Sequence, residues 1–296
     1  MRLGLCCLFN EEPITFRTTT AKYTGNLTVV ERETKLSGLC LHNAGALLES
    51  IHFCSANGIG AFRINSRILP LKTHPELGYE ILELPRGAEI VQTFKECGKT
   101  AKRHDIRLSF HPDQFTLLSS PNPEITRKSI EELSYQTEVA EWIGADVINI
   151  HGGGAYDDKK GTLKRIAENI SKLDESIRKR LTLENDDRVY TPADLLPLCQ
   201  STKTPFVYDA HHHRCLPDNL TVDEATELAL QTWNREPLFH ISSPKEGWDG
   251  PKPNRHHDYI DINDFPDCWK GLDITVDVEA KAKELAVIAL KEAMKF

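Results

Sequence analysis

Eight short apolar segments, each followed by a longer stretch of helical periodicity, constrain the fold of this chain more than any other feature. The segments are rich in Val, Ile, Leu and Phe on successive residues, which is typical of strands buried on both faces. The expected strands are Arg2–Cys7, Gly60–Asn65, Ile106–His111, Asp146–His151, Leu181–Asn185, Phe206–Ala210, Leu238–Ser242 and Gly271–Val278. Their alternation with helices predicts an α/β protein with a parallel sheet, either closed as a barrel or open and doubly wound.

The segments between the strands carry apolar residues at helical spacing. The expected helices are Leu39–Asn57, Ala88–His104, Glu124–Ile143, Leu163–Arg180, Pro192–Cys199, Thr221–Trp233 and Glu279–Met294. Thr221 and Glu224 have the spacing of a capping box at a helix start. Two long polar stretches, Glu11–Ser37 and Pro244–Asp261, are expected to be loops that follow strands. No linker or low-complexity segment interrupts the pattern, so we expect one domain over residues 1–296.

Composition narrows the class of protein. The chain is 40% apolar and 27% charged, which is ordinary for a globular protein. No stretch approaches the roughly 20 apolar residues of a membrane helix, and the apolar N-terminal run is too short for a signal peptide. The eight cysteines form no CxxC pair, which favours reduced thiols over a zinc–cysteine site. We therefore expect a cytoplasmic protein without a membrane partner.

The formal net charge of −8 argues against nucleic-acid binding by bulk positive charge. It leaves open an enzyme that contacts phosphates through a local basic patch and through bound metal ions, because ions are often the largest local charges of a site. A non-catalytic, metal-dependent DNA-binding protein is a different alternative, which the number of candidate ligands at the strand ends disfavours.

The most informative polar residues lie where the expected strands end. In a parallel barrel these ends converge on one face, where active sites lie. The side chains at or near these ends are His74, His111, His151, Glu184, Asp209, His212, His240, His256, His257 and Glu279. Chance placement of so many His, Asp and Glu residues at strand ends is improbable, so we predict a metal centre.

A mixed set of imidazoles and carboxylates suits Mn(II) or Zn(II), and the set is too large for one tetrahedral ion. We therefore expect two or three divalent ions. Within the triplet that follows the sixth strand, the D-x-x-H spacing of Asp209 and His212 favours His212 as the ligand. Strand alternation would direct His211 and His213 elsewhere, where they could orient ligands. The residues alone leave the choice between His256 and His257 open.

Three glycines, Gly152–Gly154, follow His151 directly. They could form a phosphate cradle, because bare backbone N–H groups bind anions. They could equally form a tight turn that keeps the site open. Without the Lys-Ser/Thr of a P-loop, they do not indicate a nucleotide cofactor.

Taken together, several segments resemble the UV damage endonuclease family. They are Arg2–Cys7; Phe62–Ser66 with Thr73–Pro75; Phe110–Phe115 with Ser119–Pro121; His151–Gly154; Leu183–Arg188; Asp209–His213; His240–Ser243; and Val278–Lys281. The resemblance spans nearly the whole chain in order. It implies a (β/α)8 TIM barrel related to endonuclease IV. It also implies an enzyme that nicks damaged double-stranded DNA immediately 5′ of UV photoproducts and some other lesions.

The resemblance also implies site residues and cofactors. The ligands of up to three ions, usually manganese, with Zn(II), Co(II) or Mg(II) as alternatives, would be His74, His111, His151, Glu184, Asp209, His212, His240, His256 and Glu279. It thereby favours His256 over His257. His74 and His111 would hold the most exposed ion, and Glu184 or Glu279 would bridge ions or position the nucleophile. A monomer is the family expectation.

The resemblance matches Gln114 and Phe115 to a pair that the family inserts into the duplex opposite a flipped lesion. An aromatic ring can replace lost stacking, and an amide can satisfy exposed base edges. The alternative is that Phe115 packs in the barrel mouth. Candidate contacts to flanking phosphates are Arg63, Arg67, Arg188 and Lys245, which could also be solvated surface charges.

The chain departs from the family pattern at two positions. Leu238 stands where the family often has a lysine close to the metals, and leucine can neither coordinate an ion nor donate a hydrogen bond. Leu5 stands where the family tends to have an aromatic residue at the damage pocket. These departures bear on the third metal site and on the range of lesions.

Two other enzyme classes fit the same metal-binding residues. One is an abasic-site endonuclease, and the other is a metal-dependent sugar isomerase or epimerase on the same barrel. The negative net charge favours the isomerase mildly. The Asp113–Phe115 tip and the long segment Glu11–Ser37 favour a macromolecular substrate.

Overall fold

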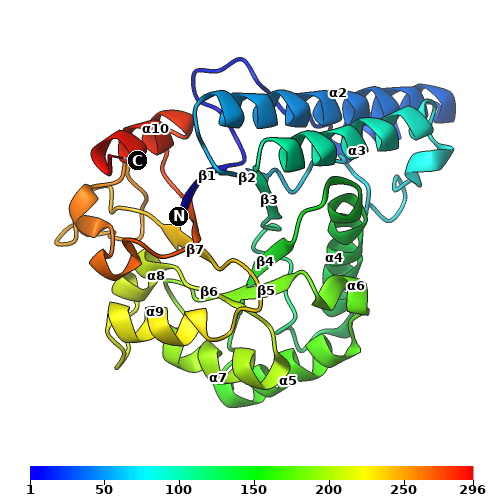
Figure 1. Cartoon of the computed structure of the whole chain (residues 1–296). Helices are drawn as coiled ribbons and strands as arrows, with labels where there is room; N and C mark the ends of the chain where they lie inside the picture. The colour runs from blue at the N-terminus through cyan, green and yellow to red at the C-terminus, as the bar shows by residue number, and fades with distance from the viewer. Residues whose placement is uncertain (296) are drawn as a thin grey trace.

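Eight parallel strands form a barrel with helices on its outside (Figure 1), and this computed structural model describes residues 1–295. A parallel bridge joins the two edge strands β6 and β7, so the sheet is closed and is not an open, doubly wound one. The predicted TIM barrel is confirmed. The strands are β1 (Arg2–Cys6), β2 (Ala61–Ile64), β3 (Arg107–Phe110), β4 (Val147–His151), β5 (Leu181–Glu184), β6 (Phe206–Val207), β7 (Leu238–Ile241) and β8 (Thr275–Val278).

The barrel has one weak seam, between β6 and β7. The hydrogen-bonded order runs β6-β5-β4-β3-β2-β1-β8-β7, so these two strands are the edges of the sheet. They are joined by an isolated parallel bridge between Asp209 and His240, where the His240 N–H donates to the Tyr208 carbonyl at 3.0 Å. Two of the predicted metal ligands therefore close the barrel.

Strand β6 is shorter than the expected segment Phe206–Ala210 because a helix interrupts it. The Asp209 carboxylate accepts a hydrogen bond from the His212 N–H at 2.8 Å and caps helix α8 (Ala210–Cys215). The strand geometry that we expected for His211–His213 is therefore wrong. An aspartate at an N-cap satisfies a helix donor that would otherwise lack a partner, which stabilises the turn out of the strand.

The helices cover the outside of the sheet. They are α1 (Ala21–Gly25), α2 (Val29–Ala56), α3 (Gly87–Arg103), α4 (Pro123–Ile143), α5 (Lys159–Lys172), α6 (Glu175–Arg178), α7 (Pro192–Thr202), α8, α9 (Val222–Leu230) and α10 (Glu284–Ala293), with short 3₁₀ helices η1 (Ile81–Glu83), η2 (Ile262–Asp264) and η3 (Asp267–Trp269). The predicted capping box of Thr221 and Glu224 is confirmed.

Several expected boundaries were wrong: β8 begins at Thr275 rather than Gly271, and α5 begins at Lys159 rather than Leu163. Three further differences have a clear physical reason. Helix α2 begins at Val29, inside the stretch expected to be a loop, because Thr28 and Glu31 form a second capping box. The expected helix Leu163–Arg180 is divided into α5 and α6, since Leu173 is extended and buried between them. Helix α10 begins at Glu284 rather than Glu279, because Glu279 still extends the line of β8 and its N–H donates to the Ile241 carbonyl.

Most of the apolar core lies between the sheet and the surrounding helices. A second, small cluster of Val147, Val207 and Leu238 is contributed by β4, β6 and β7, with Trp233 packed against it. Thr275, the β8 partner of Leu238, hydrogen bonds with the nearby Arg107 side chain. Among the described residues, no helix is long and apolar enough to cross a membrane.

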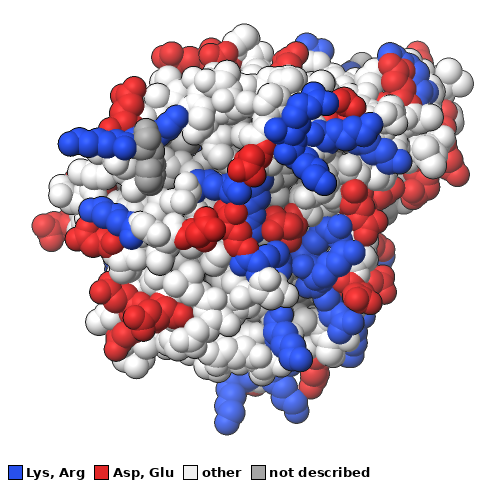
Figure 2. All heavy atoms as spheres, viewed as in Figure 1, with Lys and Arg blue, Asp and Glu red and all other residues white. Residues whose placement is uncertain are grey.

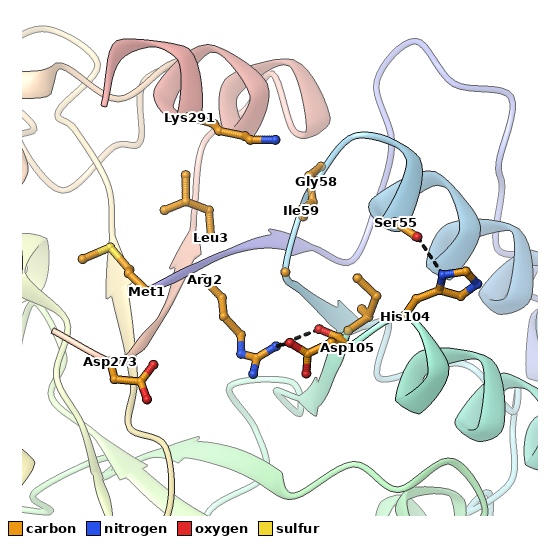
Figure 3. A pocket seen from close by; sticks show the side chains of 12 residues that line it. Met1, Arg2, Leu3, Ser55, Gly58, Ile59, His104, Asp105, Asp273 and Lys291 are labelled. Carbon is orange, nitrogen blue, oxygen red and sulfur yellow. Dashed lines mark hydrogen bonds and ion pairs between the residues drawn. The ribbon is translucent and has the colours of Figure 1, made fainter. Parts of the chain in front are cut away.

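Ion pairs close the end of the barrel where the strands begin. Arg2 pairs with Glu236 at 2.8 Å, and Arg107 pairs with Asp146 at 2.8 Å. A pocket of about 480 Å³ lies at this end, where Arg2 also reaches Asp105 (Figure 3). In the view of Figure 1, acidic and basic side chains are interleaved over the surface (Figure 2). Such pairing is a stabilising arrangement at the face of a barrel opposite its active site.

The buried carboxylate of Glu284 holds the polypeptide that follows β1. It accepts backbone N–H groups from Asn10 at 2.7 Å, Glu11 at 2.7 Å and Glu12 at 3.2 Å. Hydrogen bonds to a charged acceptor contribute about 1.5–3 kcal/mol each in favourable cases. The carboxylate therefore orders the start of the segment that leads to α2.

We expect Glu284→Gln to lower the free energy of unfolding by about 2 kcal/mol, because the neutral amide is a weaker acceptor and offers one oxygen instead of two. Urea denaturation followed by circular dichroism measures the change. Glu292→Gln is the matched control, because Glu292 is an exposed carboxylate on the same helix. Equal urea midpoints for the two variants would contradict the role assigned to Glu284.

Candidate metal centre

The centre is built around Glu184, a fully buried carboxylate at the end of β5. Four imidazoles from four other elements surround it. Their nearest nitrogens lie at 3.0 Å for His111, 3.1 Å for His240, 3.4 Å for His212 and 3.9 Å for His151. Burying a charged carboxylate away from water is costly unless it is paired with opposite charge and hydrogen-bonded. The four imidazoles therefore explain how the charge of Glu184 is accommodated.

Three groups of side chains could each hold a metal ion, and the ligand atoms within each lie within 4.8 Å of one another. The groups are His111–Glu184–His240, His151–Glu184–His212 and Asp209–His240–Glu279. Glu184 has two carboxylate oxygens and can bridge two ions. One imidazole nitrogen serves one ion, so His240 can supply its inward nitrogen to only one group at a time.

Several atoms here suit a metal because nothing else satisfies them. His151 Nδ1 and Asp209 Oδ2 are buried and have no hydrogen-bond partner among the described residues. Buried polar atoms rarely lack partners, and an ion is one explanation when they do. The donor set of imidazole and carboxylate fits Mn(II), Zn(II) or Fe(II). The residues present therefore fit a divalent metal centre.

Helix α8 orients the ligands contributed by the loop after β6. Asn185 fixes Asp209 through two hydrogen bonds, its amide oxygen accepting from the Asp209 N–H at 3.0 Å and its NH2 donating to the Asp209 carbonyl at 2.9 Å. One helical turn then brings His212 Nδ1 to 3.5 Å from Asp209 Oδ2. The structure thus brings these two predicted ligands together, although through a helix rather than a strand.

The neighbours of His212 point elsewhere. His213 lies between Tyr208, whose hydroxyl is 2.7 Å from His213 Nδ1, and Asp218, whose carboxylate is 3.0 Å from His213 Nε2. Its ring therefore stabilises α8 through Tyr208 and Asp218, and it hydrogen bonds with no side chain of the three groups. His211 is fully buried beside Trp248 and His256, with ring centroids 5.2 and 5.3 Å away.

Of the two histidines in the loop after β7, His256 lies beside the centre. Its Nδ1 is 3.8 Å from Glu279 Oε2 and 3.3 Å from the Ser242 hydroxyl. His257 is exposed, and its Nδ1 accepts the Tyr259 N–H of its own loop at 3.0 Å. The geometry favours His256 as the ligand candidate, although it belongs to none of the three groups.

His74 also lies outside the three groups. Its Nδ1 accepts the N–H groups of Glu76 and Leu77, each at 3.2 Å. Since Nδ1 uses its lone pair for these donors, the neutral ring carries its proton on Nε2. The ring would have to change its hydrogen bonding before Nε2 could bind an ion, and His74 stays a prediction as a ligand.

Arg63 points into the centre and not towards solvent. Its guanidinium forms a close ion pair with Glu279, and the side chain is largely buried. Arg63 also lines the cavity over the ligands, and its expected contact with flanking phosphates stays a prediction. The β-strand alternation places residue 63 inside the barrel, and this signal was available in the sequence.

Leu238 and Leu5 are both packed among buried apolar residues. Leu238 is buried in the cluster with Val147 and Val207, two residues before His240 on β7. Leu5 is fully buried in the core. The position that the family resemblance assigns to a damage pocket is therefore part of the packing around the barrel.

An open cavity of about 350 Å³ lies over the ligands, with His111, His151, His212 and Glu279 among its lining residues. The loop after β3 carries Gln114 and Phe115, both exposed, and 73% of Phe115 is accessible. This exposure excludes the alternative that Phe115 packs in the barrel mouth. Arg67, Arg188 and Lys245 are also exposed.

Close packing explains why glycines follow β4. A Cβ atom at Gly152 would overlap the Tyr190 ring, and one at Gly153 would overlap the Ser119 hydroxyl. Gly153 also has a φ of 81°, which other residues adopt rarely. These constraints establish the tight turn, and they leave the phosphate cradle untested.

Asn149 and Asp277 are residues of the centre that the sequence analysis overlooked. Asn149 donates to Glu184 and accepts from the Thr182 hydroxyl at 2.9 Å. Asp277 lies 3.7 Å from His240 Nε2. Both occupy positions two residues before a predicted ligand, His151 or Glu279, and strand alternation puts them on the same inward face.

The charges of the centre are strongly coupled. Burial alone would raise the pKa of Glu184, but His240, His151 and hydrogen bonds from His111 and His212 hold it well below its usual range. Burial alone would lower the pKa of His240, but Glu184 and Glu279 raise it to about 9. Burial lowers the pKa of His151. Without metal, the centre therefore retains a proton on His240 at neutral pH.

We expect the metal-free protein to lose stability as pH rises through about 9. The pKa of His240 is raised above its unfolded value of about 6.5, so its contribution is fully present below about 6.5 and lost as the folded pKa is passed. Urea midpoints of the metal-free protein, measured from about pH 6 to about pH 10 so that both pKa values are bracketed, test the fall.

The matched variant is Glu184→Gln, which removes the carboxylate that contributes most to the raised pKa. Its urea midpoint should fall less over the same range. A fall of the same size in both proteins would assign the pH dependence to other groups.

Comparisons with known proteins agree on one family. The sequence profile of the family described as UV-endonuclease UvdE matches residues 1–296. A UV DNA damage endonuclease of Bacillus mycoides (strain KBAB4) is 36% identical over 88% of this chain and 83% of its own length. One of Bacillus velezensis is 35% identical over 97% of this chain and 91% of its own length.

Solved structures show the same barrel. The crystal structure of SacUVDE aligns over 100% of this chain and 98% of its own, with a TM-score of 0.86 and 27% identity. Endonuclease IV from Thermus thermophilus aligns over 100% and 98%, with a TM-score of 0.64 and 14% identity. At that identity the second likeness shows the fold alone.

Proposed function

Because this chain belongs to the UV-endonuclease UvdE family of endonucleases, we propose that it hydrolyses the phosphodiester bond immediately 5′ of UV photoproducts in double-stranded DNA. The products would be a 3′-hydroxyl and a 5′-phosphate. We further propose that it acts as a monomeric single domain with two or three divalent ions, most favourably Mn(II), and without a nucleotide cofactor.

The observation that carries this proposal is the pair of candidate metal groups that share Glu184 beneath an open cavity. Two ions held by a shared carboxylate are an arrangement suited to in-line displacement at phosphorus. Such ions supply Lewis acidity and a nucleophilic water at neutral pH. They also supply local positive charge for binding a phosphate, which the net charge of −8 does not provide.

The protein side chains would do the holding and positioning. Glu184 would bridge two ions, since its two oxygens face different imidazoles. Glu279 would hold an ion together with His240 and Asp209. Arg63 would neutralise Glu279 and keep it oriented, and His74 and His111 would hold the most exposed ion.

We propose that Gln114 and Phe115 insert into the duplex at the lesion. Phe115 is an exposed aromatic side chain at the tip of the loop that follows His111. Its exposed ring is free to stack where a base has been displaced from the duplex, and base–aromatic stacking is favourable. Arg67, Arg188 and Lys245 would contact the flanking phosphates.

The deciding measurement uses metal-free protein and a duplex with one defined cyclobutane dimer, with and without Mn(II), analysed on a denaturing gel. The expected result is a Mn(II)-dependent cut directly 5′ of the dimer and none in undamaged DNA. Cutting only at an abasic site in a parallel duplex would support an abasic-site endonuclease. Cutting of neither duplex would reject the nuclease and make a sugar isomerase the function to test.

Glu279→Gln should lower the nicking rate by about 100-fold or more, because a metal ion contributes several kcal/mol to transition-state stabilisation and each 1.4 kcal/mol is tenfold in rate. The fold should be retained, as judged by circular dichroism. Glu168→Gln, an exposed carboxylate on α5, should nick at the normal rate. Full activity of Glu279→Gln would remove Glu279 from the mechanism.

Phe115→Ala should weaken binding of the dimer-containing duplex by roughly 5- to 150-fold, because base–aromatic stacking contributes about 1–3 kcal/mol. Fluorescence anisotropy in Ca(II), without turnover, measures the affinity. Metal content should not change. Leu82→Ala is the control. Leu82 lies on η1 and is 72% exposed, close to the 73% of Phe115. An equal loss in both variants would count against insertion.

A further inference from the structure

Asp277 is a buried carboxylate that the proposed chemistry does not use. It lies on β8 directly opposite His240 of β7 in the strand register. Both its oxygens are buried and have no hydrogen-bond partner among the described residues. A fully buried carboxylate without a partner is costly, so its position calls for a partner in the working protein.

The partner that the geometry offers is His240. The Nδ1 atom of His240 faces Glu184 at 3.1 Å and Glu279 at 3.4 Å, which are the carboxylates of the candidate centre. Its Nε2 atom faces the other way, 3.7 Å from Asp277 Oδ2, and likewise has no hydrogen-bond partner among the described residues. The two unsatisfied groups therefore face each other, one donor and one acceptor, slightly beyond hydrogen-bond distance.

The surroundings leave Asp277 few other options. Gly4 on β1 provides the space for the carboxylate, because a Cβ atom there would overlap Asp277 Oδ1. The guanidinium of Arg63 is engaged by Glu279. One strand step further down β7, Leu238 belongs to an apolar cluster that offers no donor.

We propose that Asp277 is a positioning residue for the metal centre: its carboxylate accepts a hydrogen bond from His240 Nε2–H when His240 Nδ1 binds a divalent ion. Metal-binding histidines commonly donate their second N–H to a carboxylate, which fixes the tautomer and the ring orientation. A shift of about 0.5–0.8 Å would bring the two atoms from 3.7 Å into the hydrogen-bond range. The inference rests on the proposed metal centre, but on no step of DNA cleavage.

The test is metal binding by the variant Asp277→Asn, measured without DNA. Calorimetric titration of the metal-free variant with Mn(II) should show that one ion binds about 10- to 100-fold more weakly than in the wild type. Removing a group that hydrogen bonds to a metal-binding histidine typically has an effect of this size. In the Zn(II)-loaded wild type, nitrogen-15 NMR of the imidazoles should show His240 as the tautomer protonated on Nε2, with a slowly exchanging proton. The variant should lose that slow exchange.

A purely structural role predicts a different result. It predicts that Asp277→Asn lowers the stability of the metal-free protein and leaves Mn(II) affinity unchanged. A positioning role predicts instead that the stabilisation gained on metal binding shrinks in the variant. Gly4→Ala, which displaces the carboxylate without changing it, should reproduce the metal-binding defect. If both variants bind Mn(II) like the wild type and the His240 resonances are unchanged, the proposal is overturned.

Thr275→Val provides the control on the same strand. Thr275 is buried and donates to Glu236 at 2.6 Å while accepting from Arg107 at 3.1 Å. Its loss should lower the stability of the metal-free protein and leave Mn(II) affinity unchanged. Because every readout is taken without DNA, a failure to nick photoproducts would test the proposed function and not the role of Asp277.

Discussion

The charge of Glu184 is the constraint on which the rest of the centre depends. A carboxylate that is removed from water at the end of β5 must be compensated by hydrogen bonds and opposite charge. The imidazoles of His111, His151, His212 and His240 provide this compensation from four separate elements. No local segment of the chain could assemble such a set, so the closed barrel is what makes the buried charge tolerable.

The same residues bear on barrel closure. The sheet edges β6 and β7 meet at one bridge, and the two residues of that bridge, Asp209 and His240, are also candidate ligands of one ion. An ion bound there would connect the weakest seam of the barrel directly. Metal binding and folding would then be coupled, because anything that binds only the folded protein stabilises it.

The two ends of the barrel use charge in opposite ways. Where the strands begin, Arg2 and Arg107 are matched with Glu236 and Asp146, so the ion pairs satisfy one another. Where the strands end, buried atoms such as His151 Nδ1 and Asp209 Oδ2 are left without partners. A polar group that is satisfied within the protein stabilises the fold, whereas one left unsatisfied is available to an ion or a substrate.

The sequence by itself determined the strand–helix alternation, the parallel sheet and the gathering of His, Asp and Glu residues at strand ends, because these follow from local periodicity and from the parallel arrangement of strands. Periodicity left the closed barrel and the open sheet both possible, and only the family resemblance favoured the barrel. It also determined the Thr221 capping box, which needs only neighbouring residues.

Tertiary structure decided what depends on contacts between distant segments. The turn of Arg63 towards Glu279, the position of His256 rather than His257 beside the centre and the placement of Asp277 opposite His240 all join residues of separate elements. The capping of α8 by Asp209 is local, as the Thr221 capping box is. Side-chain type and spacing say which residues face the barrel interior, but the partner of each buried charge is set by the strand register and by the loops that close over the site.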